Sequence, residues 1–291
     1  MLVSRACPDL ATWHRQLGHI NYTSIIQMVK KSLAIGMPVD LSTLPPICEH
    51  CVAAKQTKTP VPNTRRGRCT CRRLEIVHLD ITGPEDVGTP HGEKYMLNFI
   101  DDHSGMAWVY PLKKKSDAYT IFWEWKALVK NETGECIMFF RTNNGGEYTS
   151  EAFAEYLRNE GICHQTTASH TSAKNGKSEH LHRTIMNHAR AIHYDSNLPP
   201  NMWGEAVKAV GYLKNRTPTR TLDDKTPFEV WYGEHLDVSH LRELGCKVWV
   251  HIPGDNPKIY NRSVECILVG YSDSSKAYRC LHQPSGRIYV M

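Results

Sequence analysis

The sequence lacks any apolar run long enough to cross a membrane. A transmembrane helix needs about 20 consecutive, mainly apolar residues, and no stretch of the 291 residues approaches that length. The first ten residues also lack the apolar segment of a secretory signal, and they include Arg5 and Asp9. We therefore expect no signal peptide and no membrane partner.

The ten cysteines lack the regular spacing of a disulfide framework. Cys48 and Cys51 form a C-x-x-C pair, Cys69 and Cys71 form a C-x-C pair, and the others are scattered. This pattern indicates one metal site together with free thiols in a reducing compartment. We expect Cys69 and Cys71 to be free, and the protein to be intracellular.

The segment 55–73 lacks acidic residues, although the whole chain has a net charge of only +5. Two prolines disfavour a packed element there. One interpretation is contact with nucleic-acid phosphates through counterion release. The other is a solvated tether or a nuclear-localisation-like run. The basic residues are Lys55, Lys58, Arg65, Arg66, Arg68, Arg72 and Arg73.

Two histidines and two cysteines near the start have the order and spacing of a zinc site. Four residues separate His14 from His19, and 28 residues (20–47) precede the pair Cys48 and Cys51. Two imidazoles and two thiolates suit tetrahedral Zn²⁺. A module this short has little core of its own, so we expect the metal to supply folding energy. The alternative is surface histidines and free thiols.

The periodicity of apolar residues predicts a mixed α/β unit over residues 74–215. Three strands come first, and helices then alternate with strands, which is typical of a mixed sheet with helices packed on it. Ser116 is a candidate N-cap of the first long helix of this unit. The expected strands are 74–81, 95–102, 107–112, 137–140 and 161–167, and the expected helices are 116–130, 150–159 and 174–193.

Beyond residue 216 the pattern changes to short alternating strands separated by turn residues, which predicts a small β-rich domain. We therefore expect an N-terminal module (1–54), a basic linker (55–73), an α/β core (74–215) and a C-terminal extension (216–291). The zinc module itself is expected to contain one helix between its ligand pairs. The expected C-terminal strands are 245–250, 266–272, 276–279 and 287–290.

Three residues have the arrangement of a two-metal site. Asp80 ends the first expected strand, Asn143 follows the fourth, and Glu179 lies 35 residues (144–178) further on. Carboxylates that converge in this way hold two Mg²⁺ ions. Glu179 falls on the side of its helix away from the apolar stripe, as a ligand should. The alternative is an ordinary exposed glutamate that the helix dipole favours. The stripe consists of Leu181, Ile185, Ala189 and Ile192.

The motif at residues 141–148, Arg-Thr-Asn-Asn-Gly-Gly-Glu-Tyr, resembles the Arg-(Ser/Thr)-Asp-Asn-Gly-Gly-Glu-Tyr pattern of integrases from copia-type (Pseudoviridae) LTR retrotransposons. Residues 225–233 and the His-His-Cys-Cys order are also similar to that family. The resemblance covers nearly the whole chain. It implies a ribonuclease H-like integrase core, preceded by a zinc module and followed by a small β domain, within a Pol polyprotein.

The resemblance also implies a function. Asp80 and Glu179 match the first and third catalytic carboxylates, which hold Mg²⁺ or Mn²⁺. The implied reaction is metal-dependent processing of DNA ends and their transfer into target DNA, performed by multimers in the nucleus. Lys174, Lys177 and Arg183 lie near the third carboxylate and suit DNA phosphates, as do Arg65, Arg66 and Arg68 of the linker.

Asn143 departs from the family pattern, because the family has its second catalytic aspartate there. A neutral amide offsets less of the cation's charge than a carboxylate does, so we expect weaker metal binding and a rate lower by about several powers of ten. Near the third carboxylate, Asn-Gly-Val-Ala-Glu is replaced by Asn-Gly-Lys-Ser-Glu (175–179). Two hypotheses follow: an integrase with impaired activity, or a catalytically inactive nucleic-acid-binding protein derived from one. In either case we expect a decayed, truncated or domesticated copy.

Overall fold

The structure is a computed structural model that describes residues 8–41, 45–55, 70–143, 151–166, 172–251, 259, 261–272 and 275–291; at 55, 152 and 172–175 it describes the backbone only. No helix within these ranges is both long and apolar enough to span a membrane.

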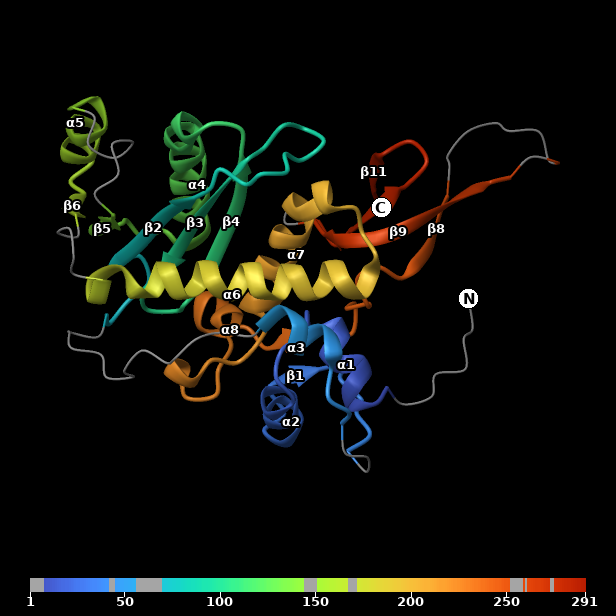
Figure 1. The fold of residues 1–291 in the computed structure, drawn as a ribbon. Coiled ribbons are helices and arrows are strands. Elements are labelled where there is room, and N and C mark those ends of the chain that lie inside the picture. Colours follow the sequence, from blue (N-terminus) through green and yellow to red (C-terminus); the bar gives the residue numbers. More distant parts are fainter. Residues whose placement is uncertain are drawn as a thin grey trace.

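A five-stranded mixed sheet forms the centre of the molecule (Figure 1). Its strand order is β4-β3-β2-β5-β6, with β4, β3 and β2 antiparallel and β2, β5 and β6 parallel. The expectation of a mixed α/β sheet is therefore confirmed. The strands are β2 (Ile76–Thr82), β3 (Tyr95–Asp101), β4 (Ala107–Leu112), β5 (Phe139–Thr142) and β6 (Cys163–Thr166).

Helices α4 (Ala118–Thr133) and α5 (Glu151–Asn159) cover one face of this sheet. An aromatic core fills the space between them and the strands; the rings of Phe99 and Trp125, for example, stack with centroids 4.2 Å apart. The expectation that Ser116 caps α4 was wrong. Ser116 lies inside a short 3₁₀ turn, Lys115–Asp117, and α4 begins only after it.

Helices α6 (Ser172–Ser196) and α7 (Trp203–Asn215) pack on the opposite face. The apolar stripe of α6, from Leu181 to Ile192, is buried, which confirms the prediction that this side of the helix faces the core. Two glycines let α7 approach closely: a Cβ at Gly204 would lie 2.9 Å from Thr89 Cγ2, and one at Gly211 would lie 2.8 Å from Val109 Cγ2. A 3₁₀ turn, Pro200–Met202, precedes α7.

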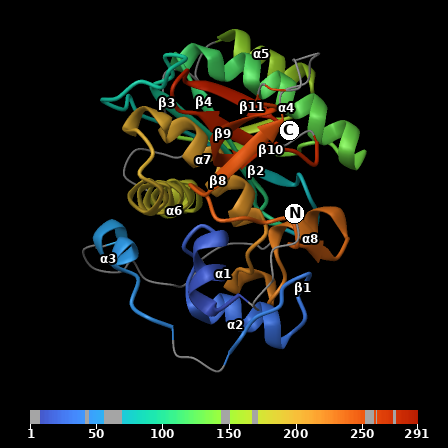
Figure 2. The same cartoon turned by 90° about the vertical axis from the view of Figure 1, so that its right-hand side faces the viewer.

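The N-terminal module lies on the far side of α6 from the sheet (Figures 1 and 2). It contains α1 (Leu10–Gln16), α2 (Tyr22–Lys30), β1 (Ala34–Ile35) and α3 (Glu49–Lys55). Asp9 and Asn21 accept backbone N–H bonds as N-caps of α1 and α2. The module does not have a separate core, because its buried residues belong to the same apolar cluster as those of α6 and α7.

The C-terminal region begins with a 3₁₀ turn (Arg220–Leu222) and α8 (Pro227–Tyr232), which Thr226 and Glu229 close with a capping box. β7 (Leu236–Asp237) pairs in parallel with β1 of the N-terminal module. A four-stranded antiparallel sheet then follows in the order β11-β10-β9-β8, which confirms the expected small β-rich unit. Its strands are β8 (Lys247–His251), β9 (Ser263–Tyr271), β10 (Tyr278–His282) and β11 (Arg287–Val290).

Candidate metal centres

The two histidines and two cysteines expected to bind zinc come together in space. One ligand atom from each of His14, His19, Cys48 and Cys51 lies within 4.8 Å of all the others. Cys51 Sγ lies 3.3 Å from His14 Nε2 and 3.6 Å from His19 Nδ1, and Cys48 Sγ lies 3.5 Å from His19 Nδ1. Zn–N bonds of about 2.0 Å and Zn–S bonds of about 2.3 Å in a tetrahedron place ligand atoms about 3.5 Å apart. The four side chains therefore fit one tetrahedral zinc ion.

Local backbone geometry places these ligands. His14 lies on α1, and Gly18 and His19 both adopt left-handed backbone conformations, with φ of 67° and 59°. A non-glycine residue seldom adopts this conformation without a compensating interaction. At this turn the conformation returns the chain so that His19 faces His14, with ring centroids 4.9 Å apart. Cys51 lies on α3, and Cys48 immediately precedes that helix.

The outer nitrogens of both histidines have partners of their own. His14 Nδ1 lies 2.5 Å from the carbonyl oxygen of Ile20. His19 Nε2 lies 3.4 Å from Asp195 Oδ2, and His50 Nε2 lies 3.2 Å from the other oxygen of Asp195. Such partners fix which ring nitrogen is free to bind a metal. Asp195 belongs to α6. Its role could not be predicted, because it lies far from the C-x-x-C pair in the sequence.

The second candidate centre contains Asp80 and Asn143. β2 and β5 are parallel neighbours with His78 opposite Arg141, so Asp80 and Asn143 occupy equivalent positions two residues further along. Asn143 Nδ2 donates a hydrogen bond of 2.9 Å to Asp80 Oδ1. Asp80 is only 5% exposed. The structure thus joins two of the three expected catalytic positions directly.

The same face of β2 points toward α6. Side chains alternate along a strand, so His78, Asp80 and Thr82 lie on one face. Thr82 Oγ1 lies 2.9 Å from His182 Nδ1 on α6. Asp80 is therefore directed at the first turns of α6, the segment that carries Glu179 as an exposed side chain. Glu179 thus lies on the helix that packs against this face of β2, and its role as a ligand stays a prediction.

Asn98 supplies a buried polar group beside Asp80 that sequence reasoning missed. It lies directly opposite Asp80 on β3, so the two side chains share one face of the sheet. Asn98 is 1% exposed, and both polar atoms of its amide lack a hydrogen-bond partner within the described parts of the chain. Buried amides are almost always paired with protein, water or an ion. An unpaired amide next to a buried carboxylate fits a site built to hold a hydrated cation.

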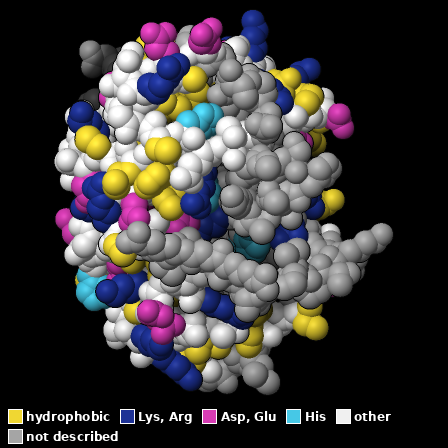
Figure 3. Space-filling view, turned by 90° about the vertical axis from the view of Figure 1, so that its left-hand side faces the viewer, with side chains coloured by type: hydrophobic (Ala, Val, Ile, Leu, Met, Phe, Trp, Pro, Cys, Tyr) yellow, Lys and Arg dark blue, Asp and Glu magenta, His cyan; other side chains and the backbone are white. Residues whose placement is uncertain are grey.

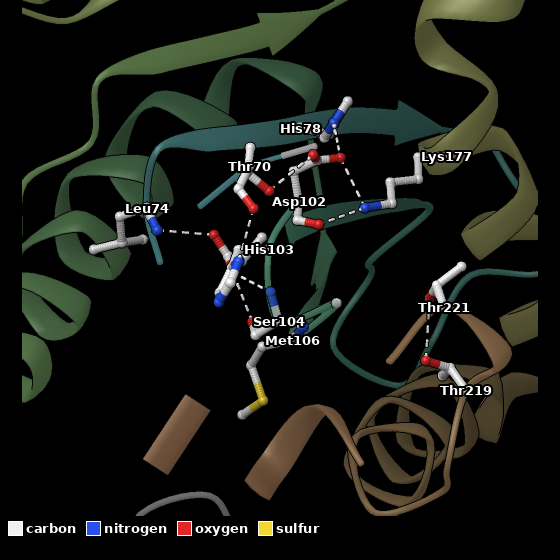
Figure 4. Close-up of polar contacts among 12 residues, drawn as sticks. Thr70, Leu74, His78, Asp102, His103, Ser104, Met106, Lys177, Thr219 and Thr221 are labelled. Carbon is white, nitrogen blue, oxygen red and sulfur yellow. Dashed lines mark hydrogen bonds and ion pairs between the residues drawn. The ribbon is translucent and has the colours of Figure 1, made fainter. Parts of the chain in front are cut away.

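Asp102 links β2 to the start of α6 (Figure 4). Its Oδ1 lies 3.1 Å from His78 Nε2 and accepts a hydrogen bond of 2.7 Å from Lys177 Nζ, while its Oδ2 accepts one of 3.1 Å from Thr70. Burial lowers the pKa of His78, and the bond to Asp102 opposes that shift only in part. His78 is therefore neutral at pH 7 and donates its Nε2–H to Asp102.

The basic side chains expected to meet phosphates differ in their surroundings. The Lys177 ammonium is engaged by Asp102, and Arg183 is exposed on α6. On the end of the molecule that carries β6 and the start of α6, lysine and arginine side chains are interspersed with acidic ones (Figure 3). The side chains of Arg65, Arg66, Arg68 and Lys174 and the glycine pair Gly145 and Gly146 lie outside the described residues.

Lys214 of α7 adds a cation beside this group that the sequence did not reveal. Its Nζ donates a hydrogen bond of 3.1 Å to the carbonyl oxygen of Gly105. Burial and the nearby charge of Lys177 lower the pKa of Lys214 to about 8. A lysine with such a pKa is partly neutral under mildly alkaline conditions.

Three protein-family models match the chain. A GAG-pre-integrase domain matches residues 1–56, an integrase core domain matches residues 72–172, and a retroviral polymerase SH3-like domain matches residues 246–291. In their order along the chain, these matches correspond to the N-terminal module, much of the central sheet unit and the whole C-terminal sheet.

Curated relatives extend the similarity over almost the whole chain. The retrovirus-related Pol polyprotein from transposon TNT 1-94 of Nicotiana tabacum is 35% identical over 268 residues, which are 92% of this chain and 20% of that protein. The corresponding polyprotein from transposon RE1 of Arabidopsis thaliana is 31% identical over 286 residues, 96% of this chain and 19% of that protein. The chain thus spans about a fifth of the length of these relatives.

Among solved structures, similar chains come from viral integrases. The HTLV-2 integrase catalytic core domain in complex with magnesium is 21% identical, with a TM-score of 0.42, and the match covers 54% of this chain and 95% of that one. A chain of the simian T-cell lymphotropic virus intasome in complex with PP2A regulatory subunit B56 gamma is 17% identical, with a TM-score of 0.47, and the match covers 81% of each chain.

Proposed function

We propose that this chain, which contains the GAG-pre-integrase, integrase core and SH3-like domains found in copia-type retrotransposon Pol polyproteins, is an integrase segment that binds DNA and joins DNA ends in a metal-dependent reaction. The observation that carries the proposal is the contact between Asp80 and Asn143 at the ends of two parallel strands, facing the helix segment with Glu179. DNA, a second copy of the chain and a nuclear location are parts of the same proposal.

In this reaction Asp80 and Glu179 would hold Mg²⁺ or Mn²⁺, and the cation would stabilise negative charge on the attacking and leaving oxygens of a phosphodiester. In the structure the amide of Asn143 donates a hydrogen bond to the carboxylate of Asp80, which the cation would need as a ligand. For Asn143 to act as a ligand, its amide has to turn and offer its oxygen, which carries no net charge. We therefore propose that Asn143 weakens cation binding and slows the reaction, while the kind of reaction stays the same.

A strand-transfer assay tests this function. The natural chain and its Asn143→Asp variant are compared with matched zinc and Mg²⁺, using blunt DNA ends and a plasmid target. We expect the variant to join ends at least about 100-fold faster, because a second carboxylate restores charge at the metal. Adding Asp80→Asn to that variant should abolish joining. Equal activity of the natural chain and the variant would show that Asn143 is not the impairment.

A second function is favoured by the same hydrogen bond. Because Asn143 satisfies Asp80 without a cation, the chain can keep its fold as a catalytically inactive nucleic-acid-binding protein. In that case the natural chain joins no ends, while it still binds DNA with an affinity that falls steeply as salt rises. Joining by the natural chain would exclude this second function, whereas joining by the Asn143→Asp variant alone would agree with it.

We further propose that the His-His-Cys-Cys set holds structural Zn²⁺. The ligand atoms have the mutual spacing of a tetrahedral site, and the module has no apolar core separate from that of α6 and α7, so a metal can add to its folding energy. Zinc measured by atomic absorption on purified protein should be close to one ion per chain, and it should be lost when both cysteines are replaced by serine.

A further inference from the structure

We propose that Asp195 couples the zinc site to α6, so that zinc binding and ordering of the C-terminal half of α6 stabilise each other. This inference rests on the proposed zinc ion and is independent of whether the chain joins DNA ends. All five strands of the central sheet lie between Cys51, the last of the zinc ligands, and Asp195 in the sequence, and only the fold brings Asp195 to the site.

The first step is the position of the carboxylate. Its two oxygens are divided between two imidazoles: Oδ2 lies 3.4 Å from His19 Nε2, and Oδ1 lies 3.2 Å from His50 Nε2. His19 turns its other nitrogen, Nδ1, toward the two cysteine sulfurs. A carboxylate that accepts the outer N–H of a ligand histidine orients the ring and makes the ligand nitrogen a stronger donor to the metal.

The second step is the burial of this contact. His19 is 1% exposed, and the side chain of Asp195 is 17% exposed. A charge in such surroundings needs polar partners, and the two histidines supply them from the N-terminal module. His50 does not belong to the ligand set, so it serves as a second, metal-free tether of the same carboxylate.

The third step is that neighbouring residues of α6 also contact the N-terminal module. Arg190 Nη1 donates a hydrogen bond of 3.3 Å to the carbonyl oxygen of Ala54 on α3, and His188 Nδ1 bonds to the carbonyl oxygen of Gly18 beside His19. Helix α3, which carries Cys51, packs along α6. Residues 188–195 of α6 therefore pack against the N-terminal module. Because the two surfaces are in contact, we expect ordering of the N-terminal module to order this part of α6, and the reverse.

Zinc affinity tests the role of Asp195 directly. The full chain is titrated with zinc in competition with a fluorescent chelator, for the natural protein and for the variants Asp195→Asn and Asp195→Ala. Loss of an outer partner of a metal-bound histidine weakens zinc binding by about 10–100-fold. We expect Asp195→Ala to reach this range, and Asp195→Asn to lose less because its amide oxygen still accepts one N–H.

A matched control separates contact from charge. Glu49 is exposed on α3 between Cys48 and His50, so Glu49→Gln removes one negative charge near the site without touching a ligand. We expect its zinc affinity to match that of the natural chain. His50→Gln should weaken zinc slightly in the natural chain and not at all when Asp195→Ala is present, because the two act through one carboxylate. Equal zinc affinity of the Asp195 variants and the natural chain would overturn the proposal.

Hydrogen exchange of the natural chain tests the other half, even if the Asp195 variants fold poorly. Because coupling is reciprocal, removal of zinc should speed amide exchange in residues 188–196 of α6 more than in β2 and β3. Faster exchange confined to the N-terminal module would contradict the coupling while leaving the zinc site intact. A chain that binds no zinc at all would overturn both the zinc proposal and this one, so the two failures are distinguishable.

Discussion

At the scale of single residues, the main observation is the hydrogen bond that the amide of Asn143 donates to the carboxylate of Asp80. The amide at this position makes a hydrogen bond where a second aspartate would place a like charge. A charge-assisted hydrogen bond to a buried carboxylate contributes about 1.5–3 kcal/mol. The natural chain therefore gains stability at the very position where it loses a charged metal ligand.

The hydrogen bond from Asn143 predicts that Asn143→Asp changes stability as well as activity. In zinc-loaded protein without Mg²⁺, Asn143→Asp should lower the free energy of unfolding by about 1–3 kcal/mol, because it removes the hydrogen bond and sets two carboxylates side by side. Added Mg²⁺ should stabilise the variant more than the natural chain. Urea denaturation with and without Mg²⁺ measures both effects; a variant as stable as the natural chain without Mg²⁺ would contradict this account.

At the scale of elements, α6 and α7 each carry a partly buried lysine on a face that otherwise packs against the sheet. Lys177 is held by Asp102 and its neighbour Lys214 by a backbone carbonyl. Of these two contacts, only that of Lys177 is to a carboxylate. Burial and the charge of Lys177 lower the pKa of Lys214 to about 8. The lowered pKa means that the folded state releases the Lys214 proton more readily than the unfolded state.

The sign of this shift gives a pH prediction. Between pH 8 and the ordinary lysine pKa of about 10.4, the unfolded chain binds more protons at Lys214 than the folded one, so this residue makes stability rise with pH. Lys214→Met should remove that rise and raise stability at pH 7, where the natural lysine is charged in its partly buried position. Melting temperatures at pH 7 and pH 9.5 measure the difference, with Lys130→Met, an exposed lysine of α4, as control.

At the scale of the whole molecule, ion pairs and one short strand pair join regions that are distant in sequence. Arg279 of β10 makes two hydrogen bonds to Glu205 of α7, of 2.6 and 2.9 Å. Burial alone would raise the pKa of Glu205, but the bond from Arg279 and the charges of Lys208 and Arg279 lower it overall. This pair fastens the C-terminal sheet to the helix that packs on the central sheet.

Breaking the pair should therefore loosen the C-terminal sheet. Arg279→Met leaves the buried Glu205 carboxylate with Lys208 alone, which should cost about 3 kcal/mol. Combining it with Glu205→Gln should recover part of that loss, because no buried charge is then left with a single partner. Arg287→Met, at an exposed arginine of β11 in the same sheet, serves as control and should change stability by less than about 1 kcal/mol. Equal losses from Arg279→Met and Arg287→Met in urea denaturation would contradict a special role for the pair.

The sequence by itself determined the features that depend on local spacing. The four zinc-ligand candidates, the strand that presents Asp80 and the helix stripe around Glu179 follow from residue types at fixed intervals. The structure brings the first set together and buries the stripe. Helix α7 was missed because it is apolar on almost every side and Met202 provides no side-chain cap, so neither a stripe nor a start signal marked it.

Only the tertiary structure decided the contacts between distant segments. The hydrogen bond from Asn143 to Asp80, the hold of Asp102 on Lys177, and the placement of Asp195 beside His19 all join residues from different elements. Their partners are chosen by which surfaces pack together once the apolar faces are buried, and no interval along the chain encodes that choice. For the same reason, the sequence predicted two ligand sets, while the fold alone placed both of them beside α6.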